Sequence, residues 1–236
     1  MNNAPIPEIR GDFSPAFEPL PTVVITGGGH ARVVIDAAHL SNEILVTAIV
    51  DDNEALVGHT VDGVPVLGTT ADLPSLAEHG LRQFVIGLGG TDRNGGADER
   101  RRLFEAGRSA GLEPIAVIHP RSIVSPRAAV GAGAVLLAGS ILNAGATVGT
   151  NAIVNSGAVI EHDVVIGDHA HIAPGAVLCG GVTIGDFCHV GAGAVIRQGV
   201  SVADGAVVGA GAVVIADVAP SQLVLGVPGR SRALSA

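Results

Sequence analysis

The chain of 236 residues has no tryptophan, no tyrosine and no lysine, and it has only five phenylalanines and two cysteines. So few aromatic side chains exclude a wide core filled by large rings. Without lysine, the chain cannot use a catalytic lysine or form a Schiff base. Two cysteines do not make a disulfide framework, so we expect a reduced, cytoplasmic setting.

Long apolar runs and clusters of basic residues are also missing. The chain has no apolar stretch of about 18 residues and no charged-then-apolar leader, so we expect a soluble protein that does not cross a membrane. The net charge of −9 and the scattered basic residues argue against nucleic acid or an anionic membrane as the main partner. What is abundant is glycine, with 34 residues, and small aliphatic side chains.

These residues follow a strict period of six. An aliphatic residue stands at every sixth position from Ile118 to Val214, and Ala, Ser, Cys or Val stands two positions earlier from Ala128 to Ala212. This period predicts a parallel β-helix of hexapeptide repeats, and neither a 3.6-residue helix nor a two-residue alternation would keep its phase. With three hexads in each coil, residues eighteen apart are stacked, which places His171 against His189.

The part of the chain before the repeats has a different pattern. Residues 1–20 are rich in proline and predict an extended or disordered arm. Residues 21–116 alternate strands with helices, which predicts an α/β domain with a small Rossmann-like parallel sheet. The expected strands are 22–26, 45–53, 83–87 and 115–118, and the expected helices are 30–41, 73–80 and 99–111. We expect the β-helix over 117–219 and a C-terminal tail over 220–236.

Three segments of the α/β domain are candidates for ligand binding. The turn Gly27–His30 lets backbone amides approach a phosphate at a helix N-terminus, although Arg32 replaces the third glycine of a dinucleotide fingerprint. Asp51 and Asp52 follow the second strand, where acidic residues bind ribose hydroxyls. The loop 89–98 follows the third strand and is either a mobile flap over a ligand or a surface insertion. A nicotinamide dinucleotide site, a nucleotide or nucleotide-sugar site and a structural turn all stay open.

The repeats carry a candidate base in the run Glu161-His162-Asp163. A carboxylate beside an imidazole fixes its tautomer and raises its basicity, as general-base catalysis requires. The residues alone leave catalysis and a plain surface histidine open. His169 and His171 suggest a metal, but the chain offers no convincing third and fourth ligands, so we expect none.

Three runs together resemble a known family. They are NSGAVIEHDVVIGDHAHIAPGAVLCGGVTIG at 155–185, GGGHARVV at 27–34 and GVPGR at 226–230. They resemble the hexapeptide-repeat sugar O- and N-acetyltransferases of the sialic acid O-acetyltransferase type. The members that look most similar N-acetylate nucleotide-linked 4-amino sugars, including UDP-4-amino sugars and GDP-perosamine. The resemblance covers nearly the whole chain after the arm.

The resemblance implies a homotrimer of left-handed β-helices, with acetyl-CoA in the groove between subunits and the nucleotide sugar on the α/β domain. It implies His162 as the general base, Asp163 as the group that holds its other ring nitrogen, and direct transfer without an acyl-enzyme. It places Gly28, Gly29, His30, Asp51, Asp52 and Gly89 at the sugar nucleotide, and Asn155 and Glu161 at the acceptor. It places His171 at the thioester, Gly180 beside pantetheine, and Ala192 and Ala210 farther along the cofactor.

The leading hypothesis is therefore an acetyl-CoA-dependent N-acetyltransferase that acts on a nucleotide-linked 4-amino sugar in polysaccharide synthesis. One alternative is O-acetylation of sialic acid or a related hydroxyl, and another is a non-catalytic trimeric scaffold or ligand sensor. Two departures from the family are visible: Asp163 stands where relatives often have Glu, and the loop after Gly89 is longer. The nucleotide, whether UDP, GDP or dTDP, stays open.

Overall fold

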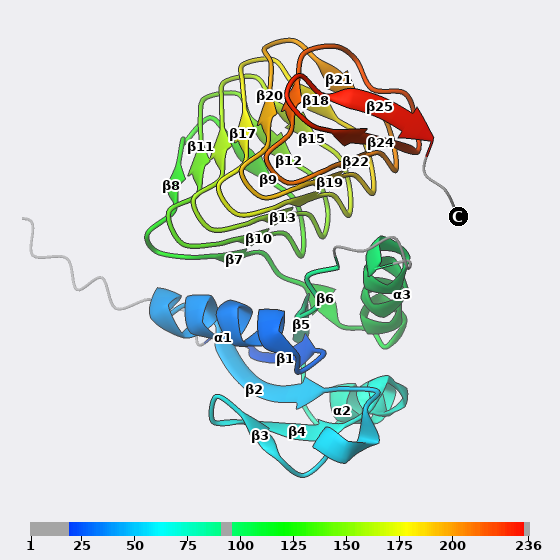
Figure 1. The fold of residues 1–236 in the computed structure, drawn as a ribbon. Coiled ribbons are helices and arrows are strands. Elements are labelled where there is room, and N and C mark those ends of the chain that lie inside the picture. Colours follow the sequence, from blue (N-terminus) through cyan, green and yellow to red (C-terminus); the bar gives the residue numbers. More distant parts are fainter. Residues whose placement is uncertain (1–18, 91–95, 234–236) are drawn as a thin grey trace, which may run out of the picture.

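The protein, described here by a computed structural model over residues 19–90 and 96–233, consists of an α/β unit and a solenoid (Figure 1). The arm expected over 1–20 lies outside the described residues up to residue 18, and so do residues 91–95 of the loop expected over 89–98. Among the residues that the structure describes, no helix is long and apolar enough to span a bilayer.

The α/β unit is one mostly parallel sheet in the strand order β3-β4-β2-β1-β5-β6, with helices packed on it. Its central strands β1 and β5 form because, after their first residues, they carry β-branched and apolar side chains that are buried on both faces. Its elements are β1 (Pro21–Ile25), α1 (Gly29–Ser41), β2 (Leu45–Val50), β3 (Thr60–Val61), β4 (Val64–Gly68), α2 (Leu73–Glu78), β5 (Gln83–Ile86), α3 (Gly96–Ser109) and β6 (Glu113–Pro114), with 3-10 turns at Glu54–Leu56 and Thr70–Asp72.

Two features of this unit differ from the sequence expectation. The single strand expected at 115–118 is wrong: β6 pairs with β5, whereas Val117–Ile118 forms β7 and pairs with the solenoid. The chain crosses from one sheet to the other at residues 115 and 116, so only the second half of the expected strand is a strand. The β3–β4 hairpin was not predicted, because Gly63 and Pro65 interrupt a segment of only nine residues.

The solenoid confirms the period of six. Each coil has three strands of two residues, and each strand from β7 to β20 pairs in parallel with the strand eighteen residues later, as Val135 does with Ile153. The three faces are the stacks β7-β10-β13-β16-β19-β22-β24-β25, β8-β11-β14-β17-β20-β23 and β9-β12-β15-β18-β21. The protein thus contains a left-handed parallel β-helix of hexapeptide repeats.

The strand bounds follow the sequence period without a slip. They are β7 (Val117–Ile118), β8 (Ile123–Val124), β9 (Ala129–Val130), β10 (Val135–Leu136), β11 (Ile141–Leu142), β12 (Thr147–Val148), β13 (Ile153–Val154), β14 (Val159–Ile160), β15 (Val165–Ile166), β16 (His171–Ile172), β17 (Val177–Leu178), β18 (Thr183–Ile184), β19 (His189–Val190), β20 (Val195–Ile196), β21 (Ser201–Val202), β22 (Val207–Val208) and β23 (Val213–Val214).

The core of the solenoid consists of the aliphatic and small residues that the period singled out. Every aliphatic position from Leu136 to Val214 is buried, and the small residues fill the space between them. Cys188 occupies one of the small positions, where burial raises the pKa of its thiol to about 11. The first three aliphatic positions, Ile118, Val124 and Val130, are partly exposed because no earlier coil covers them.

Each hexad turns through one residue with a positive φ, from position 133 to position 211 in steps of six. Ten of these fourteen residues are glycine, for which this conformation is accessible without strain. The other four are Asn151, Asp163, His169 and Phe187. A residue other than glycine in this conformation destabilises the fold by about 1–2 kcal/mol, or less for Asn or Asp. We therefore expect the side chains at these four positions to make contacts that offset the cost.

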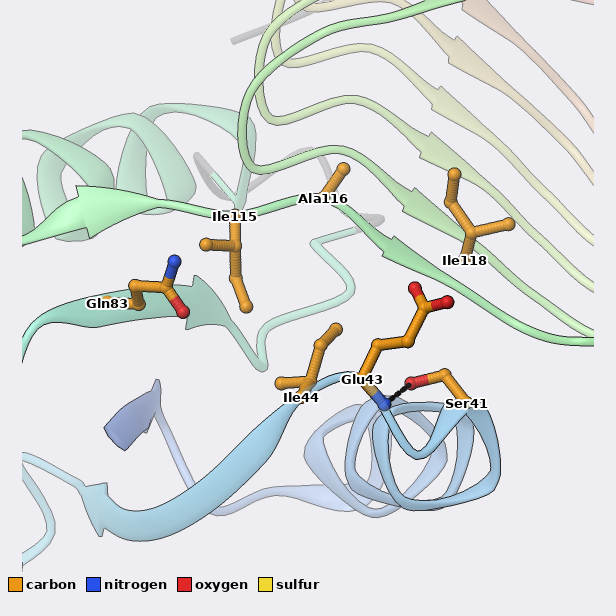
Figure 2. Close-up of a pocket in the computed structure, with 7 residues that line it drawn as sticks. All are labelled: Ser41, Glu43, Ile44, Gln83, Ile115, Ala116 and Ile118. Carbon is orange, nitrogen blue, oxygen red and sulfur yellow. Dashed lines mark hydrogen bonds between the residues drawn. The ribbon is translucent and has the colours of Figure 1, made fainter. Parts of the chain in front are cut away.

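The two parts of the protein share one apolar cluster. Val34 and Ile35 of α1 pack with Val135 and Ile153, which point outward from the solenoid. Figure 1 shows α1 beneath β7 and the first coils, and α3 on the other side of β5 and β6. At the end of α1, a hollow of about 200 Å³ lies between Ser41, Glu43, Ile44, Gln83 and the segment 115–118 (Figure 2).

The end of the chain extends one face of the solenoid. Within the segment expected as a tail, 220–236, β24 (Gln222–Leu225) pairs in parallel with β22, and β25 (Arg230–Ala233) pairs antiparallel with β24. The antiparallel strand ends the series of parallel coils. Residues 234–236 lie outside the described part.

Candidate functional site

His162 and Asp163 form the turn between β14 and β15. The Nδ1 atom of His162 lies 2.9 Å from Oδ2 of Asp163. A carboxylate oxygen accepts hydrogen bonds and cannot donate them, so Nδ1 carries the proton and Nε2 keeps its lone pair. Both side chains are exposed, at 58% and 73%. The arrangement is that of a base whose tautomer is fixed by a neighbouring acid.

Glycines in the neighbouring coils make room for this pair. A side chain at Gly180 would collide with Nε2 of His162, and one at Gly145 would collide with the carboxylate of Asp163. A hollow of about 370 Å³ opens beside the pair and is lined by both of its residues, by Gly145 and Ala144, and by Arg127. Gly180 therefore lies against the candidate base, and its expected place beside pantetheine stays a prediction. Glu161, just before the base, is half-buried.

A second polar group lies where the solenoid meets the end of β5. The Nδ1 atom of His171 is 3.2 Å from the carbonyl oxygen of Gly90, and its Nε2 is 3.2 Å from Nδ2 of Asn155. His171 stacks on His189 as the period predicted, with ring centroids 5.1 Å apart. Burial, and then the nearby His189, lowers the pKa of His171 to about 3. This ring is therefore neutral at pH 7.

The glycine turn of the α/β unit lies near the polar group of His171. Gly28 and Gly29 face open space, so a ligand can approach their backbone. A Cβ atom at Gly89 would lie 3.5 Å from the ring of His30, so these two positions are neighbours. Burial, and then the charge of Arg100, lowers the pKa of His30 to about 4. The structure thus brings together His30, Gly89 and, through the next residue, His171.

Asp51 and Asp52 both act within the fold. Asp51 accepts from the backbone N–H of Gly27 at 2.6 Å and of Asn53 at 2.8 Å, and so holds the glycine turn. Asp52 accepts from the backbone and hydroxyl of Thr70, at 2.9 and 2.6 Å, and pairs with Arg102 at 2.9 Å.

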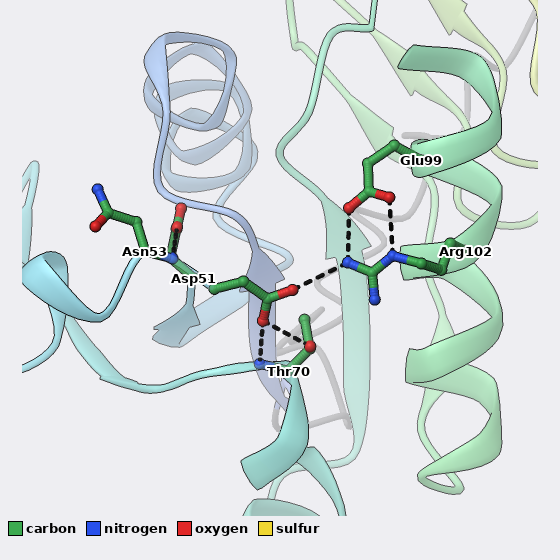
Figure 3. A network of polar contacts seen from close by, with 6 residues as sticks. Asp51, Asn53, Thr70, Glu99 and Arg102 are labelled. Atoms are coloured by element: carbon green, nitrogen blue, oxygen red, sulfur yellow. Dashed lines mark hydrogen bonds and ion pairs between the residues drawn. The ribbon is translucent and has the colours of Figure 1, made fainter. Parts of the chain in front are cut away.

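The Arg102 guanidinium links this carboxylate to α3. It also pairs with Glu99 of its own helix (Figure 3). Partial burial of Asp52 acts in the opposite direction, but the hydrogen bonds from Thr70 and Arg102 hold the pKa of Asp52 below its ordinary value. The hydrogen bond from Arg102 likewise lowers the pKa of Glu99. The network ties the end of β2 to α3.

Arg100 is a buried charged residue between α3 and the solenoid that the sequence did not predict. It is 1% exposed, and it donates to the carbonyl oxygens of His169, at 3.1 Å, and of Asn151. Burial lowers its pKa to about 10. The run of three arginines looks like a solvated helix face, which hid this residue. The signal was in the repeats, since Asn151 and His169 replace glycine at the turn positions that Arg100 contacts.

Ala192 and Ala210, expected along the cofactor, share one edge of the solenoid. The backbone N–H of Gly211, next to Ala210, donates to the carbonyl oxygen of Ala192 at 2.9 Å. The two alanines are not on the edge that carries His162 and Gly180, because the register places only residues eighteen apart in one column. One chain therefore does not bring all the expected cofactor residues together. Within the described residues, no group of three His, Cys, Asp or Glu side chains is placed to hold a metal ion.

Comparison with known families agrees with this architecture. Residues 22–94 match the PglD N-terminal domain, and residues 145–180 and 181–216 match the bacterial transferase hexapeptide model of six repeats. Comparison with curated protein sequences gives no match.

Several solved structures are similar over most of the chain. PerB from Caulobacter crescentus, in complex with CoA and GDP-perosamine, is 37% identical and has a TM-score of 0.83, over 90% of this chain and 97% of that one. The acetyltransferase domain of PglB from Neisseria gonorrhoeae, in complex with acetyl coenzyme A, is 33% identical with a TM-score of 0.82, over 91% and 100%. WeeI from Acinetobacter baumannii is 27% identical with a TM-score of 0.79, over 89% and 99%.

These matches include both parts of the molecule in the same order along the chain. The protein belongs to the hexapeptide-repeat acyltransferase family, in the group whose members join a PglD-type N-terminal domain to the β-helix.

Proposed function

We propose that this protein transfers the acetyl group of acetyl-CoA to the amine of a nucleotide-linked 4-amino sugar. The observation that carries the proposal is the His162–Asp163 pair, which fixes the proton on Nδ1 and lines a hollow on the solenoid. Support also comes from two similar proteins, since PerB binds CoA and GDP-perosamine and the PglB domain binds acetyl coenzyme A.

The chemistry needs one base and no covalent intermediate on the enzyme. The sugar amine attacks the thioester carbonyl carbon, and Nε2 of His162 takes the proton that the nitrogen loses as the C–N bond forms. The C–S bond then breaks, and the imidazolium returns the proton to the leaving sulfur, which yields free CoA and the N-acetyl sugar. Asp163 holds Nδ1–H throughout and stabilises the imidazolium.

The nucleotide sugar binds on the α/β unit in this proposal. The backbone N–H groups of Gly28 and Gly29 lie at the start of α1, where the helix dipole favours phosphate. His30 and Gly89 line the same turn, and the carboxylates of Asp51 and Asp52 keep lone pairs for the nucleoside. Asn155 and Glu161 position the acceptor sugar beside His162.

Acetyl-CoA binds along the solenoid, and the site is completed by a second subunit. Gly180 provides space beside the base for the pantetheine arm, whereas Ala192 and Ala210 lie on a different edge. Residues on two edges of one chain can line a single groove when neighbouring subunits place those edges side by side. We therefore propose a homotrimer with three such grooves.

The test is a panel of UDP-, GDP- and dTDP-linked 4-amino sugars incubated with acetyl-CoA and the purified protein. Free thiol release and product mass are followed together. We expect one sugar to gain one acetyl group, which also identifies the nucleotide. If a sugar hydroxyl is acetylated instead, the acceptor atom is oxygen and the proposal of N-acetylation is wrong. Intact acetyl-CoA with every sugar, hydroxyl acceptors included, would remove the enzyme assignment and favour a scaffold.

Two variants test the base directly. Loss of a general base lowers the rate by about 10²–10⁴-fold, so His162→Ala should lose kcat by that factor. Gly180→Ala should displace the ring and cause a similar loss, with no further loss when it is added to His162→Ala. The matched control is His59→Ala, which removes an exposed imidazole from the α/β unit and should keep full turnover. Undiminished turnover of His162→Ala would refute the mechanism.

A further inference from the structure

A directed chain of hydrogen bonds runs from the end of β5 into the solenoid. It passes from the carbonyl of Gly90 through His171 and Asn155 to the backbone N–H of Ser156. Each link has only one consistent direction, because the two ends of the chain are backbone groups with fixed roles. The carbonyl oxygen of Gly90 accepts, and the N–H of Ser156 donates.

These ends determine the proton on the His171 ring. The ring is neutral, since burial lowers its pKa to about 3, so only one of its nitrogens carries hydrogen. That nitrogen is Nδ1, because its partner at 3.2 Å is the carbonyl oxygen of Gly90. Nε2 then has a lone pair, and it accepts from Nδ2 of Asn155 at 3.2 Å. Among the described contacts, both ring nitrogens are used inside the protein.

The same chain fixes the amide of Asn155. Its Oδ1 accepts from the N–H of Ser156 at 2.8 Å, so Nδ2 is the end that faces His171. Nδ2 has two hydrogens, and the ring of His171 uses one of them. His189 lies edge-on to this ring, with an angle of 73° between the two ring planes, and its packing restricts rotation of His171. The second hydrogen on Nδ2 of Asn155 therefore points in a fixed direction.

We propose that His171 is a positioning residue that acts through Asn155, with its tautomer set by the carbonyl of Gly90. The second Nδ2–H of Asn155 donates to an oxygen of the acceptor sugar, and His171 itself makes no hydrogen bond to acetyl-CoA. This inference rests on the proposed function and adds a role that the family resemblance did not give to His171. It also connects the nucleotide-sugar unit to the solenoid, because Gly90 follows directly after Gly89.

The tautomer can be measured without turnover. Long-range ¹H–¹⁵N correlation spectra of the full-length protein, labelled with ¹⁵N-histidine, distinguish Nδ1–H from Nε2–H, and His171→Gln assigns the signal. We expect His171 to be neutral with Nδ1–H at pH 7, and to keep that tautomer in Asn155→Ala because Gly90 sets it. An Nε2–H tautomer or a charged ring would overturn the proposal.

Steady-state kinetics test the coupling. His171→Asn keeps a donor for Gly90 but has no acceptor for Asn155, whereas His171→Gln keeps an acceptor near the Nε2 position. We expect Asn155→Ala and His171→Asn each to lower kcat/KM for the nucleotide sugar by about tenfold or more, the scale of one hydrogen bond. His171→Gln should lose less. KM for acetyl-CoA should not change, and the double variant should be no worse than Asn155→Ala alone.

Two kinetic results would contradict the inference. Additive losses in the double variant would mean that the two residues act separately. A rise in KM for acetyl-CoA in both His171 variants would mean that the ring contacts the cofactor directly. If the wild-type protein has no turnover at all, the proposed function fails, and the ring spectrum still decides whether the hydrogen-bond chain exists.

Discussion

The solenoid and the α/β unit differ in whether the residues that stabilise the fold are separate from the candidate functional residues. In the solenoid, position within the hexad separates the two: inward positions such as Ile166 and Leu178 are buried, whereas His162 and Asp163 stand at an exposed turn. In the α/β unit, the same residues do both. Asp51 holds the glycine turn that is also the candidate phosphate site.

The two parts also differ in how their polar groups stabilise them. On one edge of the solenoid, Asp168, Asp186 and Asp204 each accept from a backbone N–H in the preceding coil, at 2.6–3.0 Å. In the α/β unit, Asp52 accepts from Thr70 and also pairs with a guanidinium from a distant helix. The solenoid therefore repeats one contact with a neutral backbone donor at a fixed spacing, while the α/β unit adds an ion pair between segments of unrelated spacing. This difference predicts where each part is sensitive to mutation.

The largest effect should come from placing a charge at an inward-facing position of one solenoid strand. Ile166 is 2% exposed, and its neighbour Val165 is 45% exposed. Ile166→Asp buries an unpaired charge, which costs several kcal/mol, so we expect no folded protein or a loss of the cooperative melting transition. Val165→Asp is the matched control and should keep a Tm close to wild type. Melting is measured by circular dichroism. Equal Tm values for the two variants would refute the assignment of Ile166 as inward-facing and Val165 as outward-facing.

Nearly all of the solenoid could be predicted from the sequence, because its core contacts recur at a fixed spacing of eighteen residues. The period of six from Ile118 to Val214 therefore predicted the solenoid strands up to β23 and their inward-facing buried positions after the first coil. It did not predict β24, β25 or outward residues such as Val135 that are buried against the α/β unit. The α/β unit was predicted less completely, because its contacts join segments of unrelated spacing. The β3–β4 hairpin and the crossing between β6 and β7 depend on such contacts and leave no local pattern.

The candidate site shows the same limit. The pairing of His162 with Asp163 was predicted because the two are adjacent, and the stacking of His171 on His189 followed from the period. The contact of His171 with Gly90, and the burial of Arg100 against Asn151, join distant parts of the chain. Arginine is usually exposed, so nothing in its own sequence context indicates the buried one.

A pair of glycine variants should sharpen the comparison at an intermediate size of effect. A Cβ at Gly167 would overlap the next coil, where the backbone N of Asp186 and the carbonyl carbon of Gly185 would each lie 2.6 Å away. A Cβ at Gly28 would meet nothing within 4 Å, and its φ of −75° suits alanine. One glycine is needed for packing, and the other is expected to make room for a ligand.

Gly167→Ala should therefore destabilise the protein by about 1–3 kcal/mol and lower Tm by roughly 2–10 °C, with substrate affinity unchanged. Gly28→Ala should leave Tm unchanged and raise KM for the nucleotide sugar by about tenfold, since the methyl group occupies the space of the phosphates. Calorimetry and steady-state kinetics measure both variants. A fall in Tm for Gly28→Ala, with KM unchanged, would reverse the two roles.

The smallest effect should come from the ion pairs of the α/β unit. Arg102→Gln removes the partner of Asp52 and Glu99, and because these groups are largely exposed and screened, we expect a loss of at most about 1 kcal/mol, or roughly 2–4 °C in Tm, at pH 7. Both carboxyl groups have a lowered pKa in the folded protein. Their stabilisation is therefore fully present above the pKa of the unfolded chain and is lost as pH falls through the folded pKa.

The difference in Tm between wild type and Arg102→Gln should accordingly be largest near neutral pH, shrink as pH falls below the ordinary carboxyl pKa range, and disappear once both carboxyl groups, whose pKa values are lowered, are protonated. High salt should reduce it as well. Arg108→Gln removes an exposed guanidinium from the same helix and serves as the control, with no such pH dependence expected. A difference that persists unchanged at acid pH would show that Arg102 stabilises α3 by packing, and the contrast between neutral solenoid contacts and ionic α/β contacts would then fail.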